Sequence, residues 1–229
     1  MEILHNGFTL ELSPGTFPLS TDSIVLADFV KLPKKANVLD LGSGCGTLGL
    51  LLCAKRDDCT VTGVEIEPNA HSMALHNAGQ NKIASRLNSI CADACQVSNY
   101  IKPGSFHVCV SNPPYFTAGP ESKAVPNARR EDLLSLDDLF CSAAWSLRYG
   151  GDFFLVHRPE RLAEICATAV KYGLEPKVLR LLRHKADKEV SLVLIQCRKG
   201  AKPGLKWEEK SLYDKDGFQT AYYKRIYHL

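Results

Sequence analysis

Short runs typical of buried strands alternate with helical stretches along this chain of 229 residues, and no other feature limits the fold as strongly. Such alternation predicts βαβ units and a mainly parallel α/β sheet with helices on both faces. Strands are expected at residues 37–41, 60–65, 89–92, 106–111, 151–157, 176–182 and 190–197. Helices are expected at residues 47–56, 68–81, 136–147 and 159–172. A short basic loop joins the last two strands, which predicts that they run antiparallel.

Composition narrows the class of protein. Hydrophobic residues make up 45% of the chain and charged residues 23%, which is typical of a soluble globular protein. The mean hydropathy is −0.12, and no apolar run approaches the ~20 residues of a membrane span. The N-terminus carries no recognisable secretory signal. We therefore expect a cytoplasmic protein that does not bind a membrane.

The nine cysteines are better explained as free thiols than as disulfides. Their number is odd, several lie inside apolar runs and no C-x-x-C pair occurs, so we expect a reducing compartment and no metal site. The net charge is +3, with the basic excess in the second half of the chain. That excess suits a polyanionic partner, and equally a solvated lysine-rich surface.

The first candidate site follows the strand at 37–41, which runs into Gly42, Gly44 and Gly46. Closely spaced glycines allow a tight turn and let a ligand approach the backbone at the N-terminus of the next helix. The stretch 44–49 also matches G-x-G-x-x-G, so a dinucleotide site is an alternative.

Two acidic residues at later strand ends extend this site. Glu65 ends the second strand, where its carboxylate can accept hydrogen bonds from both hydroxyls of a ribose. Asp93 follows the third strand, where it can accept a hydrogen bond from the amine of an adenine. Read together with the glycine loop, these residues predict a cofactor that contains a nucleoside.

The fourth strand ends in Asn112-Pro113-Pro114-Tyr115-Phe116. Open α/β sheets bind ligands at this edge. The Asn112 side-chain oxygen and the Pro113 carbonyl can both accept hydrogen bonds from one NH₂ group. Tyr115 offers a face for stacking a base, a contact worth about 1–3 kcal/mol. The segment predicts that a planar amine or amide nitrogen is bound and activated here, without a metal and with no histidine involved.

DLGSGCGTLG, GVEIEP, Asp93 and SNPPYF, in this order, resemble the class I S-adenosylmethionine (SAM)-dependent methyltransferases that act on planar nitrogens. More narrowly, the chain resembles the bacterial tRNA(Val) adenine-N6-methyltransferases and their small methyltransferase domain relatives. The resemblance implies a Rossmann-like fold with a mainly parallel seven-stranded sheet and an antiparallel last strand. It also divides the chain into a leader at 1–35 on the cofactor side, a methyltransferase domain at 36–200 and a tail of the same domain at 201–229.

The resemblance also assigns residues. It implies that Asn112, Pro113, Pro114 and Tyr115 are catalytic. Cofactor contacts are implied for Asp22, Asp40, Gly42, Gly44, Gly46, Glu65, Ile66, Asp93, Ala94 and Asn112. Substrate contacts are implied for Tyr115, Phe116, Arg129 and Arg130. The expected reaction is SAM-dependent N6-methylation of an adenine in RNA, and in tRNA(Val) of the adenosine next to the anticodon.

The basic stretch 180–188, together with Arg198, Lys199, Lys202 and Lys206, is a candidate phosphate contact. The tail interleaves Phe218, Tyr222, Tyr223 and Tyr227 with Lys224 and Arg225. That composition suits RNA, or aromatic side chains that pack the tail onto the edge of the sheet. We expect an RNA partner, a monomer or weak dimer, and no metal.

Four alternatives stay open. The Asn112 segment suits a protein glutamine equally well, although enzymes of that kind carry a helical domain in front of this fold. Adenine in rRNA or DNA is another substrate, but DNA-modifying relatives usually add a target-recognition region. A dehydrogenase would leave Asn112–Tyr115 unexplained. A SAM-binding module without turnover is the alternative that is not an enzyme.

Overall fold

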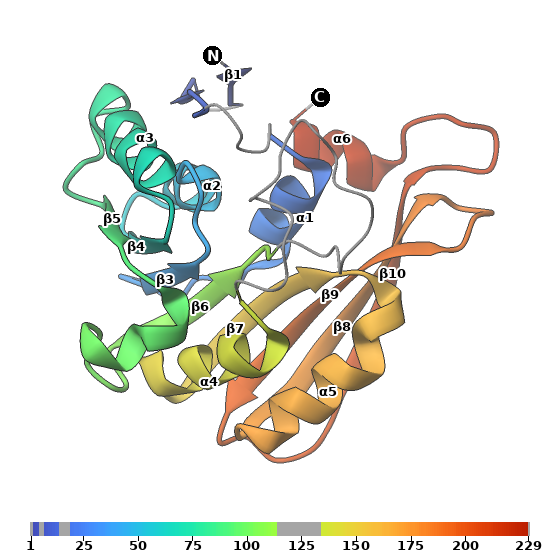
Figure 1. Ribbon diagram of the computed structural model, residues 1–229. Coiled ribbons are helices and arrows are strands. Elements are labelled where there is room, and N and C mark those ends of the chain that lie inside the picture. The colour runs from blue at the N-terminus through green and yellow to red at the C-terminus, as the bar shows by residue number, and fades with distance from the viewer. Residues whose placement is uncertain (1, 5–6, 14–18, 114–133, 229) are drawn as a thin grey trace, which may run out of the picture.

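The computed structural model describes residues 2–4, 7–13, 19–113 and 134–228. Its main sheet has eight strands in the order β10-β8-β9-β7-β6-β3-β4-β5 (Figure 1). The strands are β3 (Asn37–Leu41), β4 (Thr60–Glu65), β5 (Leu87–Cys91), β6 (Phe106–Ser111), β7 (Leu147–His157), β8 (Leu174–Lys185), β9 (Val190–Lys199) and β10 (Lys206–Tyr213). A separate short hairpin pairs β1 (Glu2–Ile3) with β2 (Thr9–Leu10).

The direction of the strands agrees with the predicted α/β sheet. Neighbours from β5 to β7 are all parallel, whereas β9 is antiparallel to both β7 and β8. The seven predicted strands all form, and β3, β4 and β6 have the predicted bounds. The eighth strand, β10, adds to the edge parallel to β8 and was not predicted. Mixed charges along Lys206–Lys210 conceal its strand character, because an edge strand buries little apolar surface.

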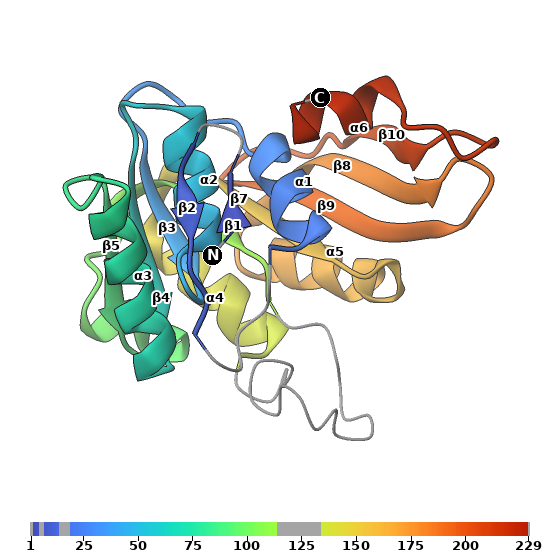
Figure 2. The same cartoon turned by 90° about the horizontal axis from the view of Figure 1, so that it is seen from above.

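Helices cover both faces of the sheet (Figures 1 and 2). They are α1 (Thr21–Phe29), α2 (Thr47–Lys55), α3 (Pro68–Gln80), α4 (Leu136–Ser146), α5 (Leu162–Lys171) and α6 (Ala221–Tyr227), with 3₁₀ turns η1 (Ala94–Asn99) and η3 (Pro159–Arg161). One core lies beneath α1, α2, α3 and α6, and a second lies beneath η1, α4 and α5. Within the described ranges, no helix is both long and apolar enough to cross a membrane.

The strand β3 shows why its sequence is almost continuously apolar. Val38 belongs to the first core, whereas Leu39 and Leu41 belong to the second. Because helices cover both faces, successive side chains are buried in opposite directions. Asp40 is the exception in this run, since it has a carboxyl side chain and is only 1% exposed.

Two helices were not predicted, and each has a local explanation. Helix α1 buries Ser23, Val25, Leu26, Ala27 and Phe29, so it lacks the clear apolar stripe of a surface helix. Helix α6 has seven residues and buries only Tyr222 and Ile226. The predicted helix at 159–172 divides into η3 and α5.

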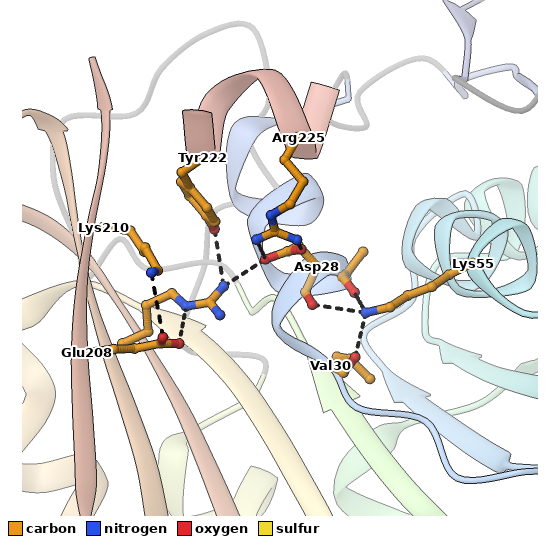
Figure 3. Close-up of polar contacts among 9 residues, drawn as sticks. Asp28, Val30, Lys55, Glu208, Lys210, Tyr222 and Arg225 are labelled. Atoms are coloured by element: carbon orange, nitrogen blue, oxygen red, sulfur yellow. Dashed lines mark hydrogen bonds and ion pairs between the residues drawn. The ribbon is translucent and has the colours of Figure 1, made fainter. Parts of the chain in front are cut away.

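A cluster of charges around the buried Arg180 joins α1 to the C-terminal elements (Figure 3). Arg180 of β8 donates to Asp28 of α1 at 2.8 Å and to Glu208 of β10 at 2.7 Å. Arg225 of α6 also donates to Asp28, at 2.5 Å. The Lys55 ammonium of α2 donates to three carbonyl oxygens at the end of α1 and just after it, including that of Val30 at 2.6 Å. Residues 20–30 are thereby fixed on the sheet.

We expect Asp28→Asn to lower the free energy of unfolding by about 3 kcal/mol, because it leaves the buried Arg180 charge with Glu208 as its one carboxylate partner among the described residues. Burial would raise the pKa of Asp28, but hydrogen bonds from Arg225 and Arg180 outweigh it and lower that pKa. The native carboxyl therefore binds fewer protons than the unfolded one, so its stabilisation is present above about pH 4 and is lost as the solution is acidified.

Urea unfolding between pH 3 and pH 7 measures both the loss of stability in Asp28→Asn and the pH dependence of the wild type. Asp137→Asn is the control, because Asp137 and its partner Lys171 are exposed. An equal loss in the two variants would contradict the role of the cluster.

Candidate functional site

The glycine loop between β3 and α2 depends on left-handed backbone. Gly42, Gly44 and Gly46 have φ angles of 74°, 55° and 82°, a region that residues with a side chain rarely occupy. The N–H groups of Gly42 and Ser43 both donate to the carbonyl of Val64, at 3.0 and 3.1 Å. The loop is therefore fastened to the end of β4, and Gly46 is the N-cap of α2.

Glu65 is held in place by two backbone N–H groups. One carboxylate oxygen accepts from Gly44 at 2.7 Å, and the other accepts from Glu67 at 2.9 Å. The side chain thus spans from β4 to the glycine loop and is 9% exposed. An ionised carboxylate has about four acceptor positions, so it can accept two further donors such as vicinal hydroxyls.

Asp40 and Ser43 carry buried oxygens that lack a hydrogen-bond partner among the described residues. Such atoms are rare in native proteins and need an explanation. Burial, followed by the nearby charge of Glu65, raises the pKa of Asp40 to about 8. A cationic or hydrogen-bond-donating ligand above the glycine loop would satisfy these acceptors, so the residues fit a polar cofactor.

Close packing of Ser43 on β4 makes Gly63 a sensitive position. A Cβ at Gly63 would lie 2.4 Å from the Ser43 Oγ and 2.7 Å from its Cβ. We expect Gly63→Ala to destabilise the protein by about 1–3 kcal/mol and to displace the glycine loop. Thermal unfolding, with and without cofactor, measures both changes. Gly79→Ala in α3 is the control, because a Cβ there meets open space and alanine favours the helix. A Gly63→Ala protein as stable as this control would contradict the packing argument.

Asp93 follows β5, next to the end of β4. Its Oδ1 accepts from the N–H of Cys95 at 2.9 Å, which caps η1, and its carbonyl accepts from the Tyr100 hydroxyl at 2.7 Å. The N–H of Ala92 donates to the carbonyl of Glu65 at 3.0 Å, so the two strand ends are joined. Ile66 is 44% exposed beside this junction. The structure therefore places Ile66, Asp93 and its neighbour Ala94 at the same edge of the sheet as the glycine loop.

Asn112 lies at the end of β6, beside β3. The hydroxyl of Ser111 donates to the carbonyl of Leu41 at 2.8 Å, which joins the ends of these two strands. The side-chain Nδ2 of Asn112 donates to the Oγ of Ser23 in α1 at 3.1 Å. This contact orients the amide, so that its nitrogen faces α1 and its oxygen faces away from Ser23. Pro113 is buried.

The structure brings together Asp40, the three glycines, Glu65, Ile66, Asp93, Ala94 and Asn112 at the carboxyl ends of β3 to β6. Asp22 is in the first turn of α1, next to Ser23. Pro114, Tyr115, Phe116, Arg129 and Arg130 lie outside the described residues. Sequence reasoning missed Ser43 and Ser23. Ser23 precedes Asn112 by 89 residues, and only the packing of α1 reveals their contact.

Much of the basic stretch makes contacts within the protein. Arg180 belongs to the cluster of charges at Asp28, and Arg183 pairs with Glu209 at 3.6 Å. Arg198 pairs with Asp152, and the Lys199 ammonium donates to two carbonyl groups. These contacts hold the basic side chains against the sheet. Their presence in the sequence is therefore explained without a contact to phosphate, which stays a prediction. Among the described residues, no cluster of three or more His, Cys, Asp and Glu could hold a metal ion.

Comparisons with known proteins agree with this arrangement. The tRNA1(Val) (adenine(37)-N6)-methyltransferase of Aliivibrio salmonicida is 29% identical over 203 residues, which cover 84% of each chain. The protein of the same name from Actinobacillus pleuropneumoniae is 26% identical over 213 residues and covers 91% of this chain and 87% of its own. A predicted O-methyltransferase from Agrobacterium tumefaciens shares the fold with a TM-score of 0.75 at 20% identity, over 91% of this chain and 96% of its own. The sequence profile of the methyltransferase small domain matches residues 18–166, and the chain therefore belongs to that family of methyltransferases.

Proposed function

We propose that this protein transfers the methyl group of SAM to N6 of an adenine base in tRNA, at the adenosine next to the anticodon. The observation that carries this proposal is the amide of Asn112, which Ser23 orients at the sheet edge that also holds Glu65 and the unpartnered Asp40. The names of the relatives support tRNA as the substrate and adenine 37 as the target. A cytoplasmic protein that acts as a monomer or weak dimer is part of the same proposal.

SAM supplies a methyl group on a sulfonium, and it carries an ammonium group, a ribose and an adenine. The buried oxygens of Asp40 and Ser43 would accept donors from its cationic end, above the glycine loop. Glu65 would accept hydrogen bonds from the ribose hydroxyls, since Gly44 and Glu67 already fix its carboxylate. Ile66, Asp93 and Ala94 would contact the adenine, and Asp22 would flank the site from α1.

The target amine needs orientation more than a strong base. Its lone pair is delocalised into the ring, and two acceptors that draw its N–H bonds out of the ring plane localise that pair. The Asn112 side-chain oxygen and the Pro113 carbonyl are the proposed acceptors, and the proton leaves to water once the new bond to nitrogen has formed. Pro114, Tyr115 and Phe116 are proposed to hold the base, and Arg129 and Arg130 to contact the substrate.

Methyl transfer from labelled SAM, with total tRNA, rRNA, DNA and protein extract in parallel, tests the substrate class. We expect label in tRNA, recovered as N6-methyladenosine after digestion. Label recovered as N5-methylglutamine would keep the chemistry of Asn112 and overturn the RNA substrate. Tight SAM binding without transfer to any pool would overturn the enzymatic function and favour a binding module.

A further inference from the structure

We propose that an aromatic row on the C-terminal part of the protein stacks unpaired RNA nucleotides next to the target base. The row comprises His184 of β8, Tyr213 of β10, and Tyr223 and Tyr227 of α6. This inference rests on the proposed RNA substrate and adds a second binding surface beyond the methyl-transfer site.

Neighbouring rings of the row are in contact, with tilts of 49° between His184 and Tyr213 and 44° between Tyr213 and Tyr223. Ring centroids lie 5.1 Å apart for His184 and Tyr213, 5.2 Å for Tyr213 and Tyr223, and 4.4 Å for Tyr223 and Tyr227. The last pair is stacked, with 25° between the ring planes. His184 is exposed and the three tyrosines are half-buried, so they anchor α6 while part of their surface faces solvent. Rings of this kind bind bases of any sequence, because every base has a π-face.

One end of the row reaches the helix that holds Asn112. The hydroxyl of Tyr227 hydrogen-bonds to the Oγ of Thr21 at 3.0 Å. Thr21 begins α1, and two residues later Ser23 accepts the hydrogen bond from Asn112. A strand whose target base lies at Asn112 would therefore have its flanking nucleotides directed towards α6.

The other end of the row opens into a hollow of about 260 Å³ lined by His184, Lys185, Tyr213 and Gly217. The tip of the β8–β9 hairpin and the connection from β10 to α6 lie side by side there (Figures 1 and 2). Asp214 accepts from the N–H groups of Asp216 and Phe218, both at 2.9 Å, and so fixes the turn. Phe218 follows Gly217 in that turn and is 71% exposed.

The polar surroundings of the row, with several ammonium groups outside the described ion pairs, suit RNA better than an apolar peptide. The ammonium groups of Lys185, Lys215 and Lys224 have no ion pair among the described residues, in contrast to the paired Arg180 and Arg225. The same loops also carry Asp187, Glu189 and Asp216. Because these charges largely offset the lysines, stacking is expected to supply most of the affinity here, and removing the rings should leave the salt dependence of binding nearly unchanged.

The test compares the double variant His184→Ala/Tyr223→Leu, which removes two rings of the row while leucine keeps part of the packing of α6, with Trp207→Ala; a thermal melt of each variant checks that it is folded. Trp207 is 78% exposed on β10, about 20 Å along the strand from Tyr213, and lies outside the row. Filter binding of an unmodified tRNA(Val) transcript should show affinity at least about tenfold weaker for the double variant, since each stacked base contributes about 1–3 kcal/mol. The KM for tRNA should rise accordingly, while the Kd for SAM stays the same. Trp207→Ala should bind tRNA like the wild type.

The outcomes separate this inference from the proposed function. Wild-type protein that methylates tRNA, together with a double variant that binds it normally, would overturn the aromatic row alone. Equal losses in the double variant and in Trp207→Ala would also overturn it, because the effect would not be local. Wild-type protein that neither binds nor methylates RNA would overturn the proposed function and the row together.

Discussion

Replacing Asn112 with alanine is expected to lower kcat for methyl transfer by about 10²- to 10³-fold, the usual loss when one preorganised electrostatic contact to a reacting group is removed. The amide oxygen is proposed to accept a hydrogen bond from the target amine, and alanine has no polar atom that could do so. SAM binding should change little, because the glycine loop, Asp40 and Glu65 lie on other strand ends. Single-turnover kinetics and calorimetric SAM binding measure the two effects separately.

Ser23→Ala is the matched variant for this prediction. Ser23 accepts the hydrogen bond from the Asn112 amide without belonging to the proposed chemistry, so it is a positioning residue. Loss of one hydrogen bond of this kind is worth about 1 kcal/mol, and kcat should fall about fivefold with little change in KM. Near wild-type turnover in Asn112→Ala would contradict the assigned role, whatever the effect of Ser23→Ala.

Asp40→Asn should weaken SAM binding strongly and stabilise the protein without ligand at neutral and alkaline pH. The pKa of Asp40 is raised to about 8, so the native carboxyl binds more protons than the unfolded one between about pH 4 and pH 8. Stability of the wild type therefore falls as the pH rises through this window and levels off above it. The amide cannot titrate, so the advantage of Asp40→Asn should grow up to about pH 8. Chemical unfolding at pH 5, 7 and 9 measures that trend.

The same carboxyl couples SAM binding to protons. A cationic ligand favours ionised Asp40, and at pH 7 a carboxyl with a pKa of about 8 is about nine-tenths protonated. Binding should therefore release close to one proton, seen as a dependence of the calorimetric heat on the ionisation enthalpy of the buffer. Asp40→Asn should abolish that dependence. A wild type that releases no proton at pH 7 would contradict this role of Asp40.

The central part of the fold could be predicted from sequence because it combines two strong local signals. Strands β3, β4 and β6 are mostly buried on both faces; β3 is followed by Gly42, β4 ends at Glu65 and β6 is followed by Asn112 and Pro113. The periphery gave no such signal. Edge strand β10 is rich in charged residues, and the character of α1 depends on elements up to 200 residues away, such as Arg225.

The candidate site likewise contains residues that the sequence locates and residues that only the structure reveals. Asp40, Glu65, Asp93 and Asn112 each lie at or next to the end of a predicted strand, so they can be located from sequence. Because these strands are parallel neighbours, their ends meet at one edge of the sheet. Their partners cannot be located in this way. Ser23 meets Asn112 only through the packing of α1, and the lack of partners for Asp40 and Ser43 is visible only in three dimensions. The charge of the basic run 180–188 suggested that Arg180 is available to phosphate. A run of basic residues does not reveal which guanidinium groups are already paired within the protein, as Arg180 is with Asp28.

The most direct test of the account is nucleoside mass spectrometry of an unmodified tRNA(Val) transcript after incubation with the purified protein and SAM. A second transcript with guanosine at the target position beside the anticodon is the control. The account predicts one N6-methyladenosine in the first transcript, none in the control, and none when Asn112→Ala replaces the wild type. An unmodified first transcript, in the presence of protein that binds both SAM and tRNA, would contradict it.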